Sequence, residues 1–297
     1  MLEGVLNINK PKGISSYGVV EHIKKTLKVK KVGHAGTLDP DATGVLLVCL
    51  GKATKIVQFL MGMEKEYRGQ MVLGVTTDTE DAQGTVISRQ DNVNIPESRI
   101  REVFEIFHGE LNQVPPMVSA LKYNGRRLYD LAREGKTVER KARKVQIYKL
   151  NVLGYKENRI DFSIVCSKGT YIRALCRDIG EELGCGAHLS SLTRARIGAF
   201  DLKDALLLGE LENNKKNIDT FLYSMDKALE YLPKVVVDNQ GAMQILDGKL
   251  ADETHIMSYP RKTSGLIRIN NVSNKLLAVA HADSRSEKVY KLVRVLS

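Results

Sequence analysis

The sequence lacks the marks of several protein classes. Its four cysteines form no Cys-x-x-Cys pair and have no clustered histidine partner, which argues against a structural zinc site and predicts small, buried thiols in a reducing cytoplasm. No uninterrupted apolar run approaches the ~20 residues that a membrane span needs. The N-terminus has no basic segment followed by an apolar one, so no signal peptide is expected. Internal repeats, low-complexity tracts and phosphate-binding glycine loops are also missing.

Acidic residues are in the minority. The 297 residues include 45 Lys plus Arg against 35 Asp plus Glu, a net charge of +10. This excess favours a polyanionic partner, although basic ribosome-associated and membrane-surface proteins share it. The length is sufficient for a sizeable core and predicts one large domain plus a smaller one.

The segment from Val32 to Val48 combines turn-forming glycines with polar side chains, and it ends in an apolar run that predicts a buried strand. Pro40 biases Asp39 away from the helical region, so this carboxylate is expected on extended backbone at the edge of a strand. Such a loop suits a reactive group. An Asx turn is the alternative interpretation of Asp-Pro taken alone.

The string that begins at His34, His-Ala-Gly-Thr-Leu-Asp-Pro-x-Ala-Thr-Gly, resembles the signature of the TruB family of pseudouridine synthases, which isomerise a uridine in the T loop of tRNA. The resemblance implies that Asp39 is the essential catalytic residue. It also implies that His34 helps to occupy the disrupted loop of the RNA, although a lone histidine is often structural. Residues 10–16 resemble the first motif of the family, which makes Lys10 a candidate substrate contact.

Tyr67 begins an alternating pattern that runs to Val75 and predicts a strand with Tyr67 on its apolar face. A core tyrosine is the ordinary explanation. The step Lys65-Glu66-Tyr67 resembles the family position whose tyrosine packs against the target base, and an aromatic ring suits that role. By the same resemblance, Leu192 lies under this tyrosine, although a core leucine would produce the same pattern.

The string Lys-Gly-Thr-Tyr-Ile-Arg, which ends at Arg173, precedes an amphipathic helix for which Thr170 is the expected N-cap. A cation in the first turn opposes the helix macrodipole and needs an anion. Asp39 is the candidate, because a guanidinium can orient a carboxylate through two hydrogen bonds and keep it ionised; a surface arginine is the alternative. The resemblance implies this pair and places Tyr171 in the pocket.

Two further segments resemble family motifs. The loop around Asp78 resembles a segment in which this aspartate supports the cleft, although turn capping explains it equally well. An insertion at about 114–144 resembles the segment that clasps the T arm. From Lys122 to Lys149 there are ten Lys or Arg against three acids, interleaved with tyrosines, which favours RNA contact over a solvated loop. The candidate contacts in it are Lys122, Arg126 and Arg127.

The later part of the chain departs more from the family. Thr193 and Ala195 replace an expected arginine and threonine, which leaves the role of Arg194 and Arg196 in RNA binding open. From residue 233 several short strand patterns predict a small barrel. It resembles a diverged PUA-type RNA-binding domain, with a purely structural cap as the alternative.

Together these patterns predict an α+β fold with a mixed, largely antiparallel central sheet and a small C-terminal PUA-like β-barrel. The expected division is a catalytic domain at 1–232 and an RNA-binding domain at 233–297. The resemblance implies a stand-alone, cytoplasmic, monomeric enzyme that converts uridine 55 in the tRNA T stem-loop to pseudouridine with no cofactor, metal, membrane or guide RNA. An RNA-folding factor and a guide-dependent synthase are the alternatives.

Overall fold

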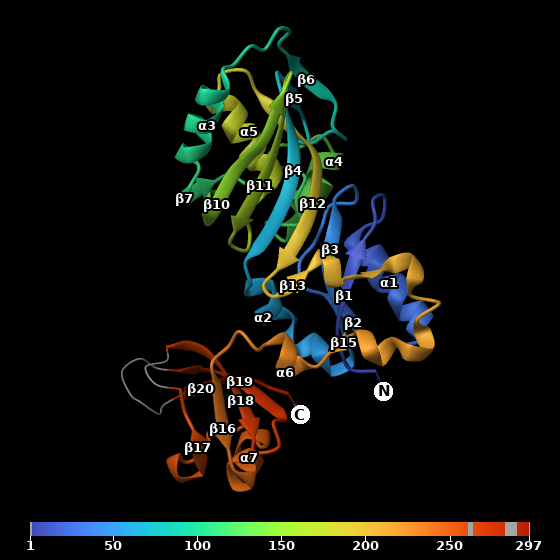
Figure 1. Cartoon of the computed structure of the whole chain (residues 1–297), viewed down its shortest axis with the longest axis vertical. Coiled ribbons are helices and arrows are strands. Elements are labelled where there is room, and N and C mark those ends of the chain that lie inside the picture. The colour runs from blue at the N-terminus through green and yellow to red at the C-terminus, as the bar shows by residue number, and fades with distance from the viewer. Residues whose placement is uncertain (1, 261–263, 283–289, 297) are drawn as a thin grey trace.

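The computed structural model describes residues 2–260, 264–282 and 290–296 of the chain. Two bodies follow one another along its long axis (Figure 1). The larger contains a long mixed sheet with helices against it, and the smaller contains the C-terminal strands. Among the described residues, no helix is long and apolar enough to cross a membrane.

The central sheet has the strand order β14-β1-β3-β12-β4-β11-β10-β7, with β2, β13 and β15 paired off this path. Only β1–β14 and β3–β12 pair in parallel, so the predicted mixed, largely antiparallel sheet is confirmed. The strands are β1 (Gly4–Lys10), β2 (Val32–His34), β3 (Thr43–Leu50), β4 (Lys65–Leu73), β7 (Gly109–Gln113), β10 (Arg143–Lys156), β11 (Arg159–Cys166), β12 (Ala187–Ile197), β13 (Phe200–Asp201), β14 (Leu206–Leu207) and β15 (Leu222–Tyr223).

The parallel pair β3–β12 joins two halves of this sheet through a short contact, in which Thr193 lies opposite Thr43 and Arg194 opposite Gly44. Below it, α1 (Ser16–Leu27) packs on β1 and β3. Above it, α3 (Glu97–Ile106) and α5 (Ile172–Glu182) cover one face of the β4-β11-β10 half (Figure 1). Each half of the sheet thus has its own helices, and the two halves meet at the β3–β12 pair.

Helix α1 follows directly from its sequence. The Ser15 side chain accepts a hydrogen bond from the Gly18 amide, which identifies Ser15 as the N-cap. The apolar residues Val19, Val20 and Ile23, which recur at helical spacing on one face, are buried. The helix ends where Lys28 takes a left-handed conformation with φ of 53°.

The apolar pattern from Ala53 to Met61 predicts one helix with Ile56, Val57, Leu60 and Met61 inward, and this prediction is wrong in its first half. A 3-10 helix, η1 (Gly51–Ile56), precedes the short α2 (Val57–Gly62). Because a 3-10 helix has a tighter turn, the inward face shifts. Phe59 is therefore buried, whereas Met61, which was expected inside, is 46% exposed.

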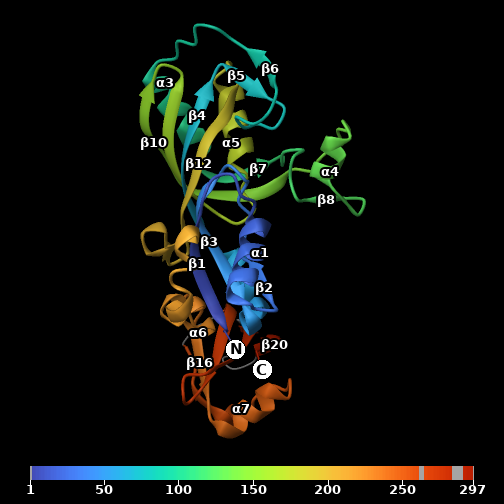
Figure 2. The same cartoon turned by 90° about the vertical axis from the view of Figure 1, so that its right-hand side faces the viewer.

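The insertion after β7 forms a small unit apart from the sheet. It contains the hairpin β8 (Lys122–Tyr123) and β9 (Arg126–Arg127), followed by α4 (Leu128–Arg133). Figure 2 shows β8 and α4 projecting away from the body of the molecule. A second hairpin, β5 (Val75–Thr77) with β6 (Val86–Arg89), extends from the end of β4.

The C-terminal strands form a separate sheet with the order β17-β16-β18-β19-β20, which confirms the predicted small β domain. The domain contains β16 (Lys234–Val237), α7 (Asn239–Leu246), β17 (Ile256–Ser258), β18 (Gly265–Asn271), β19 (Leu276–Ala282) and β20 (Tyr290–Val295), and the short helix α6 (Met225–Ala228) precedes it. Leu276 and Val279 of β19 pack in one cluster with Ala53 and Phe59 of the larger body. The two bodies thus share part of a core.

Candidate active site

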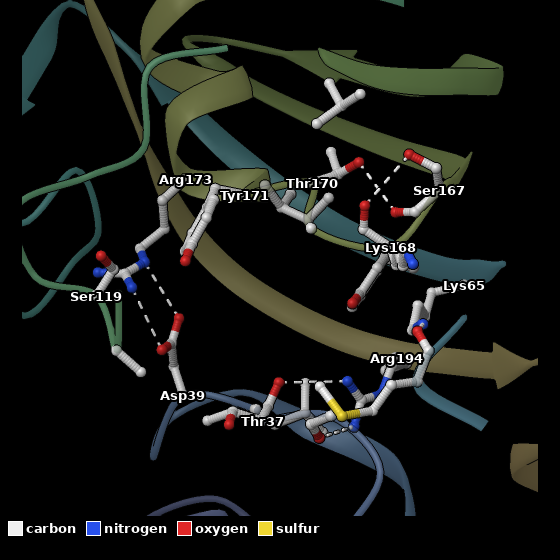
Figure 3. A pocket seen from close by; sticks show the side chains of 18 of the residues that line it. Thr37, Asp39, Lys65, Ser119, Ser167, Lys168, Thr170, Tyr171, Arg173 and Arg194 are labelled. Carbon is white, nitrogen blue, oxygen red and sulfur yellow. Dashed lines mark hydrogen bonds and ion pairs between the residues drawn. The ribbon is translucent and has the colours of Figure 1, made fainter. Parts of the chain in front are cut away.

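A cleft of about 700 Å³ opens where the two halves of the central sheet meet. Five side chains predicted for the site, which lie far apart in the sequence, line this one cleft: Asp39, Tyr67, Tyr171, Arg173 and Leu192. Figure 3 shows Asp39 facing Arg173 across one side of it. The fold therefore brings the main sequence-predicted residues together.

Asp39 and Arg173 form a two-point contact. Nε of Arg173 lies 3.1 Å from Oδ2 of Asp39, and Nη2 donates to Oδ1 at 3.3 Å. The arginine side chain is 6% exposed, whereas the aspartate side chain is 45% exposed. A buried guanidinium therefore aims a carboxylate that remains open to the cleft, an arrangement that suits reaction with a bound molecule.

The other donors of Arg173 are also satisfied. Nη1 donates to the Thr79 carbonyl at 3.2 Å and lies 3.3 Å from Oδ2 of Asp81, while Nη2 donates to the Val118 carbonyl at 2.9 Å. The guanidinium has five N–H groups, so it is fixed from every side. Because Val118 belongs to the insertion, this arginine also ties the insertion to the cleft.

Asp81 was missed by the sequence reasoning, which selected Asp78 from the same loop. Asp78 is exposed, and its Oδ1 accepts a hydrogen bond from the Thr85 amide at 2.8 Å. This side chain therefore caps a turn, which was the alternative interpretation of Asp78. Asp81 lies three residues further on and carries the carboxylate that reaches Arg173. The available signal was the second aspartate of the Thr-Asp-Thr-x-Asp string.

Effects of opposite sign set the pKa of Asp39. Burial raises it above the ordinary value, the charge of Arg173 lowers it, and the charge of Asp81 raises it. The net direction is upward, so the effect predicted for Arg173 is present but smaller than that of burial. A raised pKa suits a carboxylate that must take part in chemistry rather than remain a fixed counter-charge.

The loop that carries Asp39 is held by two buried side chains. Nζ of Lys10, a residue with 0% exposure, donates to the carbonyls of Pro11, Ile14 and Pro40 at 2.8–2.9 Å. The hydroxyl of Ser16 donates to the Leu38 carbonyl and accepts the Leu38 amide. Lys10 thus fixes the residue after Asp39 to the segment that follows β1, and Ser16 fixes the residue before it.

Arg194 supports the same loop from below. It is 1% exposed, and it donates to the carbonyls of Val45, Thr37 and Gly36 at 2.7, 3.3 and 3.1 Å. Gly44 allows this close approach, because a Cβ there would lie 2.2 Å from the Arg194 carbonyl oxygen and the backbone has φ of 104°. The sequence reasoning left the role of this arginine open, and the structure places it inside the protein.

Arg196, two residues further along β12, has a different environment. It pairs with Glu64 at 2.9 Å and with Glu66 at 3.1 Å, and it is not part of the cleft. Of the two arginines whose role was left open, one therefore lies under the loop that carries Asp39, and the other is neutralised by glutamates outside the cleft.

Tyr67 and Leu192 lie on the neighbouring strands β4 and β12. Tyr67 is 8% exposed, and burial raises the pKa of its hydroxyl while the charge of Arg194 opposes that rise. Leu192 is half-buried and packs against the same core cluster as Tyr67. An aromatic ring backed by an aliphatic side chain at a cleft wall can hold a planar base.

The start of α5 differs from the prediction. The N-cap is Tyr171 rather than Thr170, and no side chain caps it. Instead, the amide of Gln113 bonds both backbone groups of Tyr171, accepting its N–H at 2.8 Å and donating to its carbonyl at 3.1 Å. The Thr170 hydroxyl donates to the Ser167 carbonyl. A buried residue of β7 thus fixes the turn that presents Arg173.

His34 lies beside the loop that carries Asp39 rather than in the cleft. It ends β2, pairs with Val48 in the sheet, and is not among the residues that line the cavity. Burial, together with the charge of Arg194, lowers its pKa, so it is a neutral imidazole at neutral pH. A neutral ring can donate or accept one hydrogen bond at each nitrogen but supplies no charge.

The predicted basic residues of the insertion lie on its surface. Lys122, Arg126 and Arg127 are exposed on the β8–β9 hairpin, and Arg126 pairs with Glu134 of the segment after α4. The guanidinium groups of Arg127 and Arg133 lie 5.6 and 5.5 Å from the centre of the Tyr129 ring. Charge and an aromatic surface therefore occur together on a projecting unit (Figure 2).

The described residues include no group of three or more His, Cys, Asp or Glu side chains placed to hold a metal ion. The cleft itself is lined by side chains of several kinds. These supply one open carboxylate, a paired arginine, stacking surfaces and further basic residues.

Comparison with known protein families shows to which family the chain belongs. Residues 24–172 match the family described as "TruB family pseudouridylate synthase (N terminal domain)", and residues 173–230 match the "tRNA pseudouridylate synthase B C-terminal domain". The chain belongs to the TruB family. It is a pseudouridine synthase, and the recognition made from the His34 string is confirmed.

Relatives cover nearly the whole chain. The tRNA pseudouridine synthase B of Clostridium acetobutylicum is 43% identical over 98% of this chain and 100% of its own. The Clostridioides difficile protein of the same name is 41% identical over 92% of each chain. Among solved structures, a "Cbf5-Nop10-Gar1 Complex" matches with a TM-score of 0.79 and 30% identity, over 99% of this chain and 85% of that one.

A second solved structure, "H/ACA RNP bound to a substrate RNA containing 2'-deoxyuridine", matches with a TM-score of 0.75 and 28% identity over 99% of this chain and 85% of that one. These likenesses confirm the predicted fold class. The family boundary after residue 172 falls within one structural unit, because α5 and β12 lie beyond it but belong to the central body.

Proposed function

We propose that this TruB-family protein converts the uridine at position 55 in the T loop of tRNA to pseudouridine, with Asp39 as the reacting group. The Asp39–Arg173 pair carries the proposal, because it holds one carboxylate open to a cleft that stacking side chains also line. The relatives named tRNA pseudouridine synthase B, which match from end to end, support tRNA as the substrate.

The target uridine cannot react while stacked, so it is turned out into the cleft. There Asp39 either adds to C1′ of the ribose or removes the C2′ proton, and the C1′–N1 bond breaks with its electron pair passing to the base. The base rotates and a C1′–C5 bond forms, while the Asp39–C1′ bond breaks in the first route or the C2′ proton returns in the second. The C5 proton then leaves and N1 gains a proton. No redox change or group donor is needed, and Tyr67, backed by Leu192, holds the base throughout.

The projecting insertion is the proposed contact for the T stem-loop. Lys122, Arg126 and Arg127 would pair with phosphates, and the tyrosines beside them offer stacking surfaces. Arg173 connects this unit to the reaction, because it bonds both Asp39 and the Val118 carbonyl. Direct grasp of RNA by the chain itself favours an enzyme that needs no guide RNA.

The test compares wild-type protein with Asp39→Asn on an unmodified T-arm RNA that carries 5-tritiated uridine. Tritium release measures turnover and filter binding measures affinity. Wild-type turnover without guide RNA, lost in Asp39→Asn while binding persists, is the expected result. Tight binding with no wild-type turnover would overturn the proposal and favour a guide-dependent synthase or an RNA-folding factor.

We also propose that residues 1–232 form the catalytic domain and 233–297 a PUA-like RNA-binding domain, in a cytoplasmic monomer. The five-stranded sheet that begins at β16 supports the division, and Asp226 anchors it through Arg268 at 2.7 Å and Asn270 at 2.7 Å. Substitution of the exposed Lys249 and Lys291 by alanine should weaken binding of whole tRNA more than of the isolated T arm. Equal affinities for both RNAs would favour a structural cap, and light scattering tests the monomer.

A further inference from the structure

Two buried cations form one side of the cleft, opposite Asp39. Arg194 is 1% exposed and Lys65 is 6% exposed, and both line the same cavity as the catalytic carboxylate. Figure 3 shows Asp39 and Arg173 on one side of the pocket, with Arg194 and Lys65 on the other. Tyr67 lies on the same strand, β4, as Lys65, so its ring lies close to the charges of Lys65 and Arg194.

Neither cation has an acidic partner among the residues that the structure describes. Arg194 donates to the carbonyls of Val45, Thr37 and Gly36, and Lys65 donates to those of Met61 and Met63 at 2.7 and 2.5 Å. Carbonyl dipoles solvate such a charge without cancelling it. A buried, uncompensated charge costs several kcal/mol, so its presence at a cleft wall calls for a functional explanation.

Arg173, which lines the same cleft, provides the contrast. It contacts two carboxylates, Asp39 at 3.1 Å and Asp81 at 3.3 Å, so its charge is locally balanced. The buried positive charge that no carboxylate balances therefore lies on the Arg194 side of the cleft, whereas Arg143, Lys144 and Lys168, which also line it, are exposed to solvent.

The charge of Arg194 affects the pKa values of three neighbouring side chains. Burial and then the charge of Arg194 lower the pKa of Lys65 to about 8, and the same two causes lower the pKa of His34. The charge of Arg194 also opposes the rise that burial causes in the pKa of Tyr67. Its field thus extends over the tyrosine that would hold the base.

Breakage of the C1′–N1 bond creates a negative charge on the base, close to the positive charges of Arg194 and Lys65. The electron pair of that bond leaves with N1, so the detached uracil is an anion whose charge is shared between N1 and its two carbonyl oxygens. The positive counterpart remains on the ribose side, next to Asp39. Fixed charges that face a developing anion in a water-poor site lower the barrier without reorganising.

We propose that Arg194 and Lys65 form the positive wall of the base pocket, whose fixed charge stabilises the uracil anion between its release from N1 and its capture through C5. This inference rests on the proposed reaction at Asp39. It divides the cleft into a carboxylate side that handles the sugar and a cationic side that handles the base. No additional reactant is required: C5 supplies the pair of its ring double bond to the new C1′–C5 bond, loss of the C5 proton restores that double bond, and the pair left on N1 takes up a proton.

The test uses the basicity of the leaving base. Fluorine at C5 withdraws electrons and makes the departing anion intrinsically more stable, so a 5-fluorouridine T arm depends less on the positive wall. Single-turnover loss of the target nucleotide, measured by chromatography after nuclease digestion, would compare Arg194→Met with wild type on both RNAs. We expect a loss of about 100-fold with uridine, the scale of removing one such electrostatic contact, and a clearly smaller loss with 5-fluorouridine.

Arg196→Met is the matched control, because Arg196 lies on the same strand but pairs with Glu64 and Glu66 outside the cleft. Its rates should stay within about twofold of wild type on both RNAs, since removal of a surface ion pair has small effects. Filter binding should show similar affinities for all three proteins. A purely structural role for Arg194 would slow both substrates by the same factor, and that result would overturn the proposal.

If Arg194→Met does not fold by circular dichroism, Lys65→Met receives the same comparison, and equal losses on the two substrates there would overturn the proposal. Arg194→Lys should recover part of the rate, because it restores a charge without the planar hydrogen bonds. Inactive wild-type protein would instead defeat the proposed function. The two failures are therefore distinguishable.

Discussion

Asp81 shares Arg173 with Asp39: its Oδ2 lies 3.3 Å from Nη1, while Asp39 contacts Nε and Nη2 of the same guanidinium. One buried arginine thus orients two carboxylates of different exposure, since Asp81 is 20% exposed and Asp39 45%. The second carboxylate both fixes the arginine and adds negative charge near the first.

Asp81→Asn should shift the pH dependence of activity. Burial raises the pKa of Asp39, and the negative charge of Asp81 raises it further. Asparagine removes that charge, so the pKa of Asp39 falls and the carboxylate stays ionised at lower pH. The acid limb of kcat/KM against pH should therefore move to lower pH. Asp78→Asn is the control, because Asp78 only caps a turn; an upward shift in Asp81→Asn would contradict this account.

Gly44→Ala should destabilise the protein strongly. A Cβ at this position would lie 2.2 Å from the carbonyl oxygen of Arg194, on backbone with φ of 104°. Overpacking and backbone strain together are expected to cost about 3 kcal/mol in the free energy of unfolding. Urea titration followed by circular dichroism measures it. Gly62→Ala, where nothing lies within 4 Å, should stay close to wild type; similar losses in both variants would contradict the steric explanation.

Arg127→Ala should weaken RNA binding without slowing the chemical step. The side chain is exposed on the projecting hairpin and stacks near Tyr129. Loss of one phosphate contact should reduce the salt dependence of log Kd by about one unit of slope. Filter binding across several salt concentrations measures this, and single-turnover rates at saturating protein should be unchanged. Arg101→Ala removes an exposed arginine that pairs with Glu97 on α3 and serves as the control; an equal effect there would indicate general charge attraction.

Thiol labelling should distinguish one cysteine from the other three. Cys49, Cys166 and Cys176 are buried, and burial raises the pKa of Cys49 to about 12 and that of Cys166 to about 11. Cys185 is only half-buried. Since the thiolate is the reactive form, native protein should be alkylated first at Cys185, and all four should react in denaturant. Peptide mass spectrometry identifies the sites; rapid labelling of Cys49 in native protein would contradict the burial.

Local patterns predicted the elements on which the site is built. Helix α1 follows from Ser15 and an apolar face that includes Ile23, and β11 from the alternation that ends at Cys166. These features depend on capping, steric limits and burial periodicity, which act over a few residues. Pro40 likewise restricts Asp39 through its own ring. The family string around Asp39 then indicated which loop matters.

Contacts between distant segments were decided only by the tertiary structure. Asp39 and Arg173 are 134 residues apart, and no local rule selects Asp81 over Asp78 as the second carboxylate. β12 also shifts register between Arg194 and Arg196. This irregularity lies between an arginine under the catalytic loop and one at the surface, and strand alternation does not predict it.

The sequence by itself therefore predicted five of the residues that line the cleft, because side-chain type, capping and periodicity are local properties. The fold decided which charges are paired and which are not. Lys10, Lys65 and Arg194 are ordinary basic residues in the sequence, and each becomes a buried cation on backbone carbonyls only where the sheet halves meet. Burial sets the desolvation free energy of a charge, and long-range packing sets which groups its electrostatic field reaches. Both arise only in the folded structure.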